Sequence, residues 1–247
     1  MIEMRMNKAK DSLYNGNVVS VPLGPFTPDL IEHFGPLGFD GIWIEGEHGP
    51  VDFGDIPDLT RACDLWGLTS VVRVHQNEPS VIYRTMDLGA QSIVVPHVNT
   101  KNEALSVVDA AKFQPLGNRG SFTSRQGIGV ENYFKKANDQ TMVIILIEDI
   151  IAINNLDEIL EVDNIDVFFV APGDLAQTMG FPGGANLPVV QQTLTEAINK
   201  INSCGKYAGT LCNVDNVKSY IDVGAKFIGF SWLTWLNKGA KDFHNSI

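Results

Sequence analysis

Short apolar runs alternate with longer amphipathic runs along almost the whole chain. The apolar runs are rich in Val, Ile and Phe and lack period-two alternation, which is typical of strands that are covered on both faces. Eight strands are therefore predicted, at residues 18–22, 39–45, 70–74, 92–96, 142–148, 165–170, 207–211 and 226–230.

The amphipathic runs between these strands predict helices. They lie at residues 28–37, 55–66, 79–88, 102–112, 151–161, 188–204 and 215–223, and a last helix begins near Trp232. Pro79 and Pro188 suit the first turn of a helix. Eight strand–helix units predict a parallel sheet closed into a (β/α)₈ (TIM) barrel, in one domain that spans residues 1–247. Residues 114–140 are expected to form a long irregular loop.

Composition supports a single packed barrel. The chain has 247 residues, of which 44% are apolar, including 13 Phe and 4 Trp. No apolar run approaches the ~20 residues that cross a bilayer, and residues 1–10 are polar, so a cytoplasmic protein without membrane contact is predicted. The net charge of −11 argues against a nucleic-acid partner. Cys63, Cys204 and Cys212 form no CxxC motif and are interpreted as small apolar residues.

Two acidic residues follow neighbouring strands, where a barrel of this type carries its active site. Glu148 follows an apolar run, and Asp174 follows the next strand and a Pro-Gly turn. A buried carboxylate is costly unless it is paired or bound to a cation, and oxygen ligands suit Mg²⁺ or Mn²⁺. The alternative is that Glu148 pairs with Arg73 while Asp174 caps a helix, and the sequence leaves both interpretations open.

Other strand ends also carry candidate chemistry. Arg73 lies on an apolar strand, where its guanidinium either binds a carboxylate or enolate oxygen or forms a structural ion pair. His48 lies in a turn with Glu45 and Glu47, which could fix its tautomer and raise its basicity. The amides of Gly173 and Asp174 are expected to open a further short helix directly after the sixth strand, where they could bind a substrate carboxylate.

Several short segments occur together in a specific order. They are Gly46-Glu47-His48, Val72-Arg73-Val74, Asp87-Leu88-Gly89-Ala90-Gln91, Gly117-Asn118-Arg119-Gly120, Ile147-Glu148 and Pro172-Gly173-Asp174-Leu175. With them, the chain resembles the metal-dependent class II pyruvate aldolases of the HpcH/HpaI family from about Leu23 to Leu236. The resemblance implies a barrel of the phosphoenolpyruvate/pyruvate-binding type. It also implies a homotrimer or homohexamer in which the last helix is exchanged between subunits.

The resemblance also implies roles for individual residues. Glu148 and Asp174 match the metal carboxylates, for Mg²⁺ or Mn²⁺ with Co²⁺ as a third option, and Arg73 matches the contact to the 2-oxo and enolate oxygen. The remaining matches are His48 for proton transfer, Gly173 for the pyruvyl carboxylate, Asp87 as support for the histidine and Leu211 as an apolar wall near the aldehyde.

The chain departs from the family at two of these strand ends. Glu45 stands where the family usually has Asp, so the carboxylate that is a candidate partner for His48 is on a longer side chain here. Leu146 stands where the family usually has Gln.

The predicted function is aldol cleavage and addition of 4-hydroxy-2-oxo acids, giving pyruvate and an aldehyde through an enolate that the cation and Arg73 stabilise. The expected partners are a small 2-oxo acid and an aldehyde. Two alternatives use the same site: oxaloacetate decarboxylation, or carbon–carbon cleavage of a CoA thioester. A third is a barrel that binds a 2-oxo acid without turnover.

Overall fold

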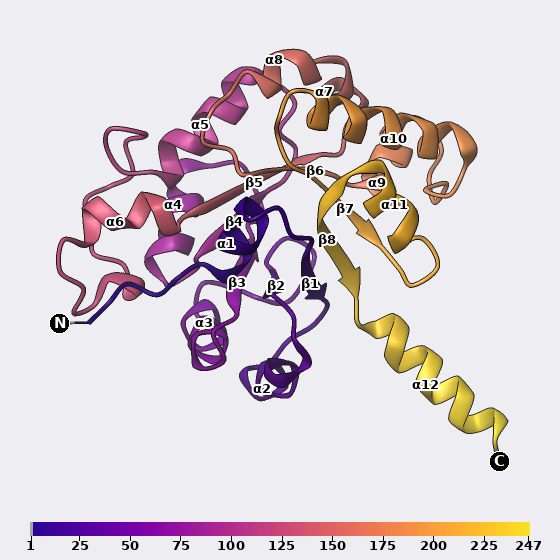
Figure 1. Cartoon of the computed structure of the whole chain (residues 1–247), viewed down its shortest axis with the longest axis horizontal. Coiled ribbons are helices and arrows are strands. Elements are labelled where there is room, and N and C mark those ends of the chain that lie inside the picture. Colours follow the sequence, from indigo (N-terminus) through magenta and orange to yellow (C-terminus); the bar gives the residue numbers. More distant parts are fainter. Residues whose placement is uncertain (1) are drawn as a thin grey trace.

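The computed structural model describes residues 2–247 and confirms the predicted (β/α)₈ barrel. Eight parallel strands pair in sequence order, and β8 pairs with β1 to close the ring (Figure 1). The strands are β1 (Val19–Leu23), β2 (Gly41–Glu45), β3 (Thr69–Arg73), β4 (Ser92–Val95), β5 (Met142–Ile147), β6 (Val167–Val170), β7 (Ala208–Cys212) and β8 (Ala225–Ser231). Each predicted strand is present, with its ends shifted by at most a few residues.

Helices follow each of the first seven strands and surround the barrel. They are α2 (Pro28–Phe34), α3 (Ile56–Leu65), α4 (Pro79–Asp87), α5 (Lys101–Ala111), α6 (Tyr133–Gln140), α7 (Ile150–Asn154), α8 (Leu156–Leu160), α9 (Pro172–Thr178), α10 (Pro188–Ser203) and α11 (Val217–Val223). Short 3₁₀ turns lie at η1 (Gly35–Leu37) and η2 (Arg125–Gly127). Pro79 and Pro188 begin α4 and α10, as predicted.

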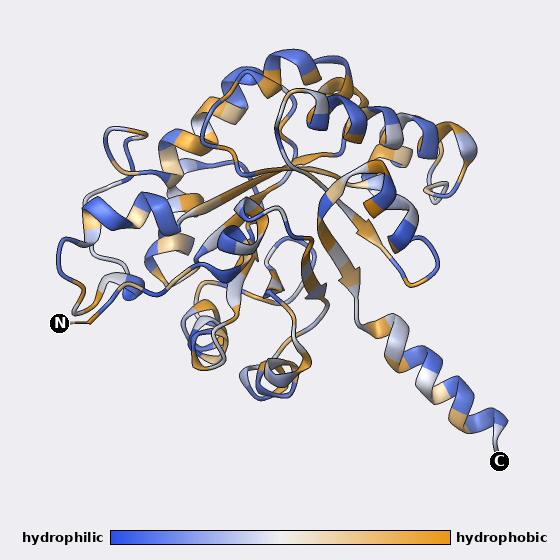
Figure 2. Ribbon diagram, in the orientation of Figure 1, coloured by the Kyte–Doolittle hydropathy of each residue, from blue (hydrophilic) through white to orange (hydrophobic). Residues whose placement is uncertain are grey.

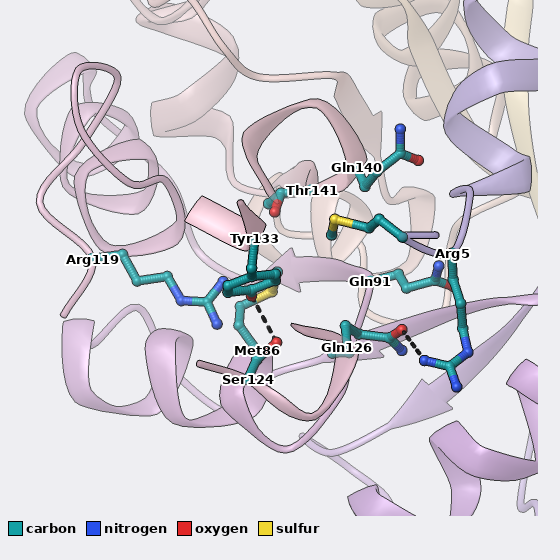
Figure 3. A pocket seen from close by; sticks show the side chains of 11 residues that line it. Arg5, Met86, Gln91, Arg119, Ser124, Gln126, Tyr133, Gln140 and Thr141 are labelled. Atoms are coloured by element: carbon teal, nitrogen blue, oxygen red, sulfur yellow. Dashed lines mark hydrogen bonds between the residues drawn. The ribbon is translucent and has the colours of Figure 1, made fainter. Parts of the chain in front are cut away.

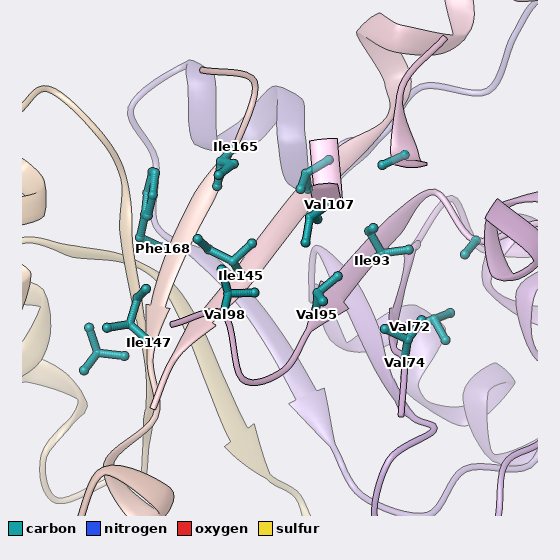
Figure 4. Close-up of a cluster of buried hydrophobic side chains, with 14 of the residues drawn as sticks. Val72, Val74, Ile93, Val95, Val98, Val107, Ile145, Ile147, Ile165 and Phe168 are labelled. Atoms are coloured by element: carbon teal, nitrogen blue, oxygen red, sulfur yellow. The ribbon is translucent and has the colours of Figure 1, made fainter. Parts of the chain in front are cut away.

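The strands separate two apolar layers. Ile144 and Leu146 of β5 belong to a cluster inside the barrel, whereas Ile145 and Ile147 belong to the larger cluster between strands and helices. Figure 4 shows this outer cluster, in which Phe168 of β6 also lies. Because both faces of each strand are covered by apolar side chains, the strand sequences show no polar alternation.

A helix that the sequence did not predict, α1 (Lys8–Tyr14), packs into the inner layer of the barrel. Its Ala9 and Leu13 are fully buried in the interior cluster. The backbone N–H of Ala9 donates to Thr69 Oγ1, 2.9 Å away, at the first residue of β3. The amino-terminal ends of the strands are thus covered, and the opposite end is the one that remains available for a site.

Two sequence predictions need correction. The single helix predicted at 151–161 is two helices, α7 and α8, because the backbone leaves helical geometry at Asn155, whose side chain donates to Asn99 O at 2.9 Å. The stretch 114–140 is not wholly irregular, since it contains η2 and α6. Helix α6 is stabilised by packing of Tyr133 and Ala137 against Phe113, a contact that no local pattern reveals.

The last helix, α12 (Leu233–Asn245), extends away from the barrel (Figure 1). No residue of α12 is buried, and Figure 2 shows hydrophobic positions along it. At its start, Trp235 stacks on Phe39 with ring centroids 5.9 Å apart, and the preceding Trp232 packs against Phe34. Farther along, Leu236 and Phe243 are 58% and 64% exposed.

Candidate functional site

The carboxyl-terminal ends of the barrel strands surround one cavity of about 120 Å³. Five residues that the sequence singled out line it: Glu45, Arg73, Gly173, Asp174 and Leu211. The remaining lining residues are apolar, namely Leu23, Trp43, Leu146, Phe169 and Ala171. The cavity therefore combines a charged rim with an apolar floor, which is the general character of a small-molecule site.

Arg73 forms the central ion pair of this rim. Its Nε lies 3.0 and 2.8 Å from the two carboxylate oxygens of Glu45, and its Nη2 lies 2.8 Å from Glu45 Oε2. Its Nη1 is 3.0 Å from Glu47 Oε2, without hydrogen-bond geometry. The pairing of Arg73 with Glu148 that the sequence left open is not what the structure shows.

The carboxylate of Glu45 accepts hydrogen bonds from four residues, one of which is Arg73. Oε1 accepts the backbone N–H groups of Glu47 and His48, at 2.8 and 3.0 Å, and Oε2 accepts Nε1 of the buried Trp43 at 3.3 Å. Burial alone would raise the pKa of Glu45, but the hydrogen bonds and charge of Arg73, with the two backbone donors, hold that pKa below its ordinary value. Glu45 therefore remains ionised and fixed.

Glu148 lies immediately beyond β5 and is only 2% exposed. Its Oε1 accepts the backbone N–H of His97 at 2.8 Å. Burial raises the pKa of Glu148, the N–H and charge of His97 oppose that rise, and the negative charges of Asp174 and Glu47 add to it. Asp174 is close enough to Glu148 to contribute to this shift, so the two acids share one electrostatic environment.

Asp174 lies at the third position of α9 and lines the cavity. The N-cap position before the helix is occupied by Ala171, and no side chain makes a capping hydrogen bond there, so Asp174 does not act as the helix cap. Gly173 is next to it on the cavity wall, and a Cβ at Gly173 would meet no atom within 4 Å. The backbone at Gly173 is thus open to approach by a ligand.

His97 is a site residue that the sequence alone did not single out. It follows β4 with φ of 53°, and its side chain is 61% exposed. Its Nδ1 lies 3.4 Å from Glu148 Oε1 and its Nε2 lies 3.6 Å from Glu47 Oε1. The only sequence signal was a polar residue at the end of an apolar strand, which many barrel strands share.

His48 and Asp87 are not in contact with each other within one chain. The imidazole of His48 is 67% exposed, with Nε2 4.0 Å from Glu47 Oε1. Asp87 ends α4, close to where β4 begins, and it pairs there with Arg119 at 2.6 Å. The proton-transfer role of His48 and the supporting role of Asp87 stay predictions.

The carboxylates of the rim outnumber its cations. Arg73 is the one arginine that lines the cavity with Glu45 and Asp174, while Glu47 contacts Arg73 and Glu148 lies near Asp174. Within residues 2–247, no three His, Cys, Asp or Glu side chains form a complete ligand set. The carboxylates of Glu148 and Asp174, with water and substrate oxygens as further ligands, fit Mg²⁺ or Mn²⁺. Such ions are usually held by one or two carboxylates.

A second, smaller cavity lies away from this site (Figure 3). Its volume is about 10 Å³, and its lining includes Gln91 and Thr141, which immediately precede β4 and β5. It is therefore at the amino-terminal end of the strands and is too small for a substrate.

Across the described part of the chain, no helix is long and apolar enough to span a membrane.

Comparison with known proteins gives consistent matches over nearly the whole chain. The profile of the family HpcH/HpaI aldolase/citrate lyase matches residues 23–233. A 2-keto-3-deoxy-L-rhamnonate aldolase of Escherichia coli strain UMN026 is 33% identical over 243 residues, covering 96% of this chain and 91% of that protein.

Solved structures also match this chain over nearly its whole length. An HpcH/HpaI aldolase/citrate lyase family protein of Burkholderia cenocepacia J2315 superposes with a TM-score of 0.91 at 25% identity, covering 98% of this chain and 99% of that one. The citrate synthase SbnG superposes with a TM-score of 0.87 at 23% identity, covering 98% of each chain, and supports the fold alone. The resemblance seen in the sequence is confirmed.

Proposed function

Because the chain belongs to the HpcH/HpaI aldolase/citrate lyase family and is a carbon–carbon lyase, we propose that it acts on 4-hydroxy-2-oxo acids. It cleaves the C3–C4 bond to give pyruvate and an aldehyde, and it forms that bond in the reverse direction. The relative from Escherichia coli is named for a 2-keto-3-deoxy acid. We extend that substrate class, but not that particular acid, to this chain.

One observation carries the proposal. Arg73, Gly173 and Asp174 line a single cavity, and Glu148 lies close enough to Asp174 for their charges to interact. A 2-oxo acid has an anionic carboxylate and a polarisable carbonyl side by side. The cavity offers a guanidinium and open backbone to such a ligand, and two carboxylates to a cation that the ligand could share.

Glu148 and Asp174 are the proposed ligands of a divalent cation, Mg²⁺ or Mn²⁺. The fit rests on Glu148, a carboxylate that is almost fully buried and has a raised pKa. Within residues 2–247 it makes no ion pair with a lysine or arginine, and its one basic neighbour is His97. When bound, the cation supplies Lewis-acid polarisation of the 2-oxo group.

Arg73 has donors left for the substrate. A guanidinium has five N–H groups, and the hydrogen bonds that Arg73 makes to Glu45 use only Nε, whereas Nη1 and Nη2 lie within ion-pair distance of Glu47 and Glu45. N–H groups of these two terminal nitrogens are therefore available to the oxygen that becomes negative as the C3–C4 bond breaks. Donors fixed in advance at such an oxygen often make the greatest single contribution to catalysis.

The proton steps are assigned to the β2–α3 loop. We propose that His48, directly or through water, accepts the proton of the 4-hydroxyl group. The C4–O bond then becomes a carbonyl, and the electron pair of the C3–C4 bond passes to the pyruvate enolate beside Arg73. Protonation at C3 completes pyruvate. The exposure of the His48 imidazole allows it to exchange that proton with solvent.

Deuterium exchange at the pyruvate methyl group tests enolisation without knowledge of the aldehyde. In D₂O with Mg²⁺ or Mn²⁺, wild-type protein should exchange the methyl protons, as followed by proton NMR. Exchange should stop after chelation, return on metal addition, and be absent in Glu148→Gln and Asp174→Asn. Asp149→Asn is a matched control, because Asp149 adjoins Glu148 but its side chain caps α7.

Full exchange after chelation would remove the metal from the mechanism. Binding of pyruvate with no exchange would instead indicate a barrel that holds a 2-oxo acid without turnover. If exchange occurs, mass analysis of products from oxaloacetate, from pyruvate with aldehydes, and from malyl thioesters separates aldol chemistry from decarboxylation and thioester cleavage.

We also propose that the chain assembles as a homotrimer or homohexamer that exchanges α12 between subunits. The support is a helix that leaves the barrel with Leu236 and Phe243 exposed. Next to its first turn lies an apolar groove of about 220 Å³, lined by Phe39, Val214, Val217, Phe230 and Trp235 among others. Exposed apolar surface of this kind is usually covered by a partner.

A further inference from the structure

His97 adopts a left-handed backbone conformation, which is unfavourable for a residue with a side chain. Its φ is 53°, and within residues 2–247 the only other residues besides glycine with positive φ are Asn132 and Asn164. Asparagine tolerates this region better than most residues, whereas branched side chains almost never enter it. Strained backbone of this kind is often found at functional sites, where surrounding contacts hold it.

The unusual conformation brings two groups of His97 to the same carboxylate. The backbone N–H donates to Glu148 Oε1 at 2.8 Å, and Nδ1 of the imidazole lies 3.4 Å from that same oxygen. The two residues can meet because each lies just beyond the end of one of two paired strands, in which Val95 of β4 is the partner of Ile145 of β5.

The contact with His97 makes the two carboxylate oxygens of Glu148 unequal. Oε1 is engaged by His97, while within the described chain no hydrogen bond is made to Oε2. A carboxylate held by one oxygen cannot rotate freely, so its other oxygen points in one direction. Partners that hold a metal-binding carboxylate in this way commonly contribute 10–100-fold to metal affinity.

We infer that His97 is a positioning residue for Glu148: its left-handed backbone directs an N–H at Oε1 and leaves Oε2 for the cation. This inference rests on the proposed function, because it supposes that Glu148 binds a cation. The backbone amide carries the effect, and the imidazole, which also lies 3.6 Å from Glu47, is secondary.

The test compares Mn²⁺ affinity, measured by electron paramagnetic resonance of the free ion, in variants of the full-length chain. His97→Asn removes the imidazole but tolerates the left-handed backbone, so its affinity should stay within about threefold of wild type. Alanine disfavours the left-handed backbone, and valine disfavours it more strongly. The Mn²⁺ affinity of His97→Ala should therefore be below that of wild type, and that of His97→Val should be lower still, by about tenfold or more relative to wild type.

Asn164→Val is the matched control. Asn164 has φ of 65° and lies before β6, at the end of the barrel away from Glu148. Valine there imposes a similar backbone cost, so its melting temperature should fall much as in His97→Val. Its Mn²⁺ affinity should equal that of wild type. Circular dichroism establishes that each variant is folded, and His97→Ala carries the test if His97→Val does not fold.

Three outcomes would overturn the inference. Wild-type affinity in folded His97→Ala and His97→Val would show that the backbone does not position Glu148. Equal losses in His97→Asn and His97→Val would assign the effect to the imidazole. Absence of Mn²⁺ binding in the wild type and in Asn164→Val would remove the proposed cation function as well, which distinguishes that failure from the other two.

Discussion

Glu45 and Arg73 are direct cross-strand partners, and they form the most extensively bonded ion pair of the site. Glu45 is the last residue of β2, Arg73 is the last residue of β3, and the two are paired in register. Arg73 Nε reaches both carboxylate oxygens, at 3.0 and 2.8 Å. The carboxylate therefore fixes the plane of the guanidinium, which leaves Arg73 no freedom to turn away from the cavity.

Arg73→Lys should lower kcat by roughly 100-fold or more, because an ammonium group cannot engage Glu45 and a substrate oxygen in fixed directions at once. Deuterium exchange into pyruvate and steady-state aldol cleavage both measure this loss. Arg61→Lys is the control, since Arg61 pairs with Asp58 on the exposed face of α3. Near-normal exchange in Arg73→Lys would show that a single positive charge is sufficient.

Trp43→Phe should lower kcat about fivefold with little change in KM. It removes the N–H that Trp43 donates to Glu45 Oε2 at 3.3 Å, and a hydrogen bond of this kind contributes on the order of 1 kcal/mol. If Trp43 acts through Glu45, the loss should disappear when Glu45 is already Gln.

Phe227→Leu separates this effect from simple loss of aromatic volume. Phe227 is fully buried in the same interior cluster but does not line the cavity. The Phe227→Leu substitution should lower the melting temperature and leave kcat unchanged. An equal fall in kcat for Phe227→Leu would assign the effect of Trp43→Phe to packing.

Glu148→Gln should stabilise the metal-free protein while it abolishes activity. Burial and the charges of Asp174 and Glu47 make an ionised Glu148 unfavourable, as its raised pKa reflects, and Gln has nearly the same shape without the charge. Calorimetry in EDTA should show a higher melting temperature, at roughly 2–4 °C for each kcal/mol gained.

Metal addition provides the complementary measurement. Mn²⁺ should raise the melting temperature of wild type and of Asp149→Asn, because a ligand that binds only the folded state stabilises it. It should leave Glu148→Gln unchanged. A full Mn²⁺ response in Glu148→Gln would place the cation elsewhere.

Lys112 should give the protein a stability that increases with pH above about 8. Lys112 is buried, and burial lowers its pKa to about 8, against the opposing charge of Asp166. Between pH 8 and the ordinary lysine pKa near 10.4, the unfolded chain binds more protons than the folded one, so unfolding becomes less favourable as pH rises. The slope can approach about 1.4 kcal/mol per pH unit.

The measurement is the free energy of unfolding of wild type and Lys112→Met between pH 7.5 and 9.5. The additional rise should be present in wild type and absent in Lys112→Met, and a control variant at an exposed lysine, Lys218→Met, should keep it. Lys112 Nζ also donates to the backbone oxygens of Asn138 and Thr141, so Lys112→Met should be less stable throughout. Parallel pH curves would contradict the assignment.

The double variant Leu236→Asp with Phe243→Asp should dissociate the proposed oligomer, because both side chains are exposed apolar residues of α12. Light scattering coupled to size exclusion should show three or six chains for wild type and fewer for the variant. Lys241→Glu, a charge change on the same helix, should keep the wild-type mass. A monomeric wild type would refute the exchange of α12.

The sequence alone determined the eight strands, the helices that begin at Pro79 and Pro188, and the two acids that follow β5 and β6. These features are local: a strand covered on both faces is apolar throughout, and an acid placed just after one is visible as an exception. It did not determine α1 or α6, which depend on packing against distant segments, nor the break at Asn155.

The contacts within the site were decided only by the tertiary structure. Glu45 looked like a partner for His48, but strand register set it opposite Arg73, 28 residues away in the chain. His97 reached Glu148 through a backbone conformation that its residue type does not predict. The strand register and the contact between His97 and Glu148 each join residues that are far apart in the sequence, so no short segment contains the information that fixes them.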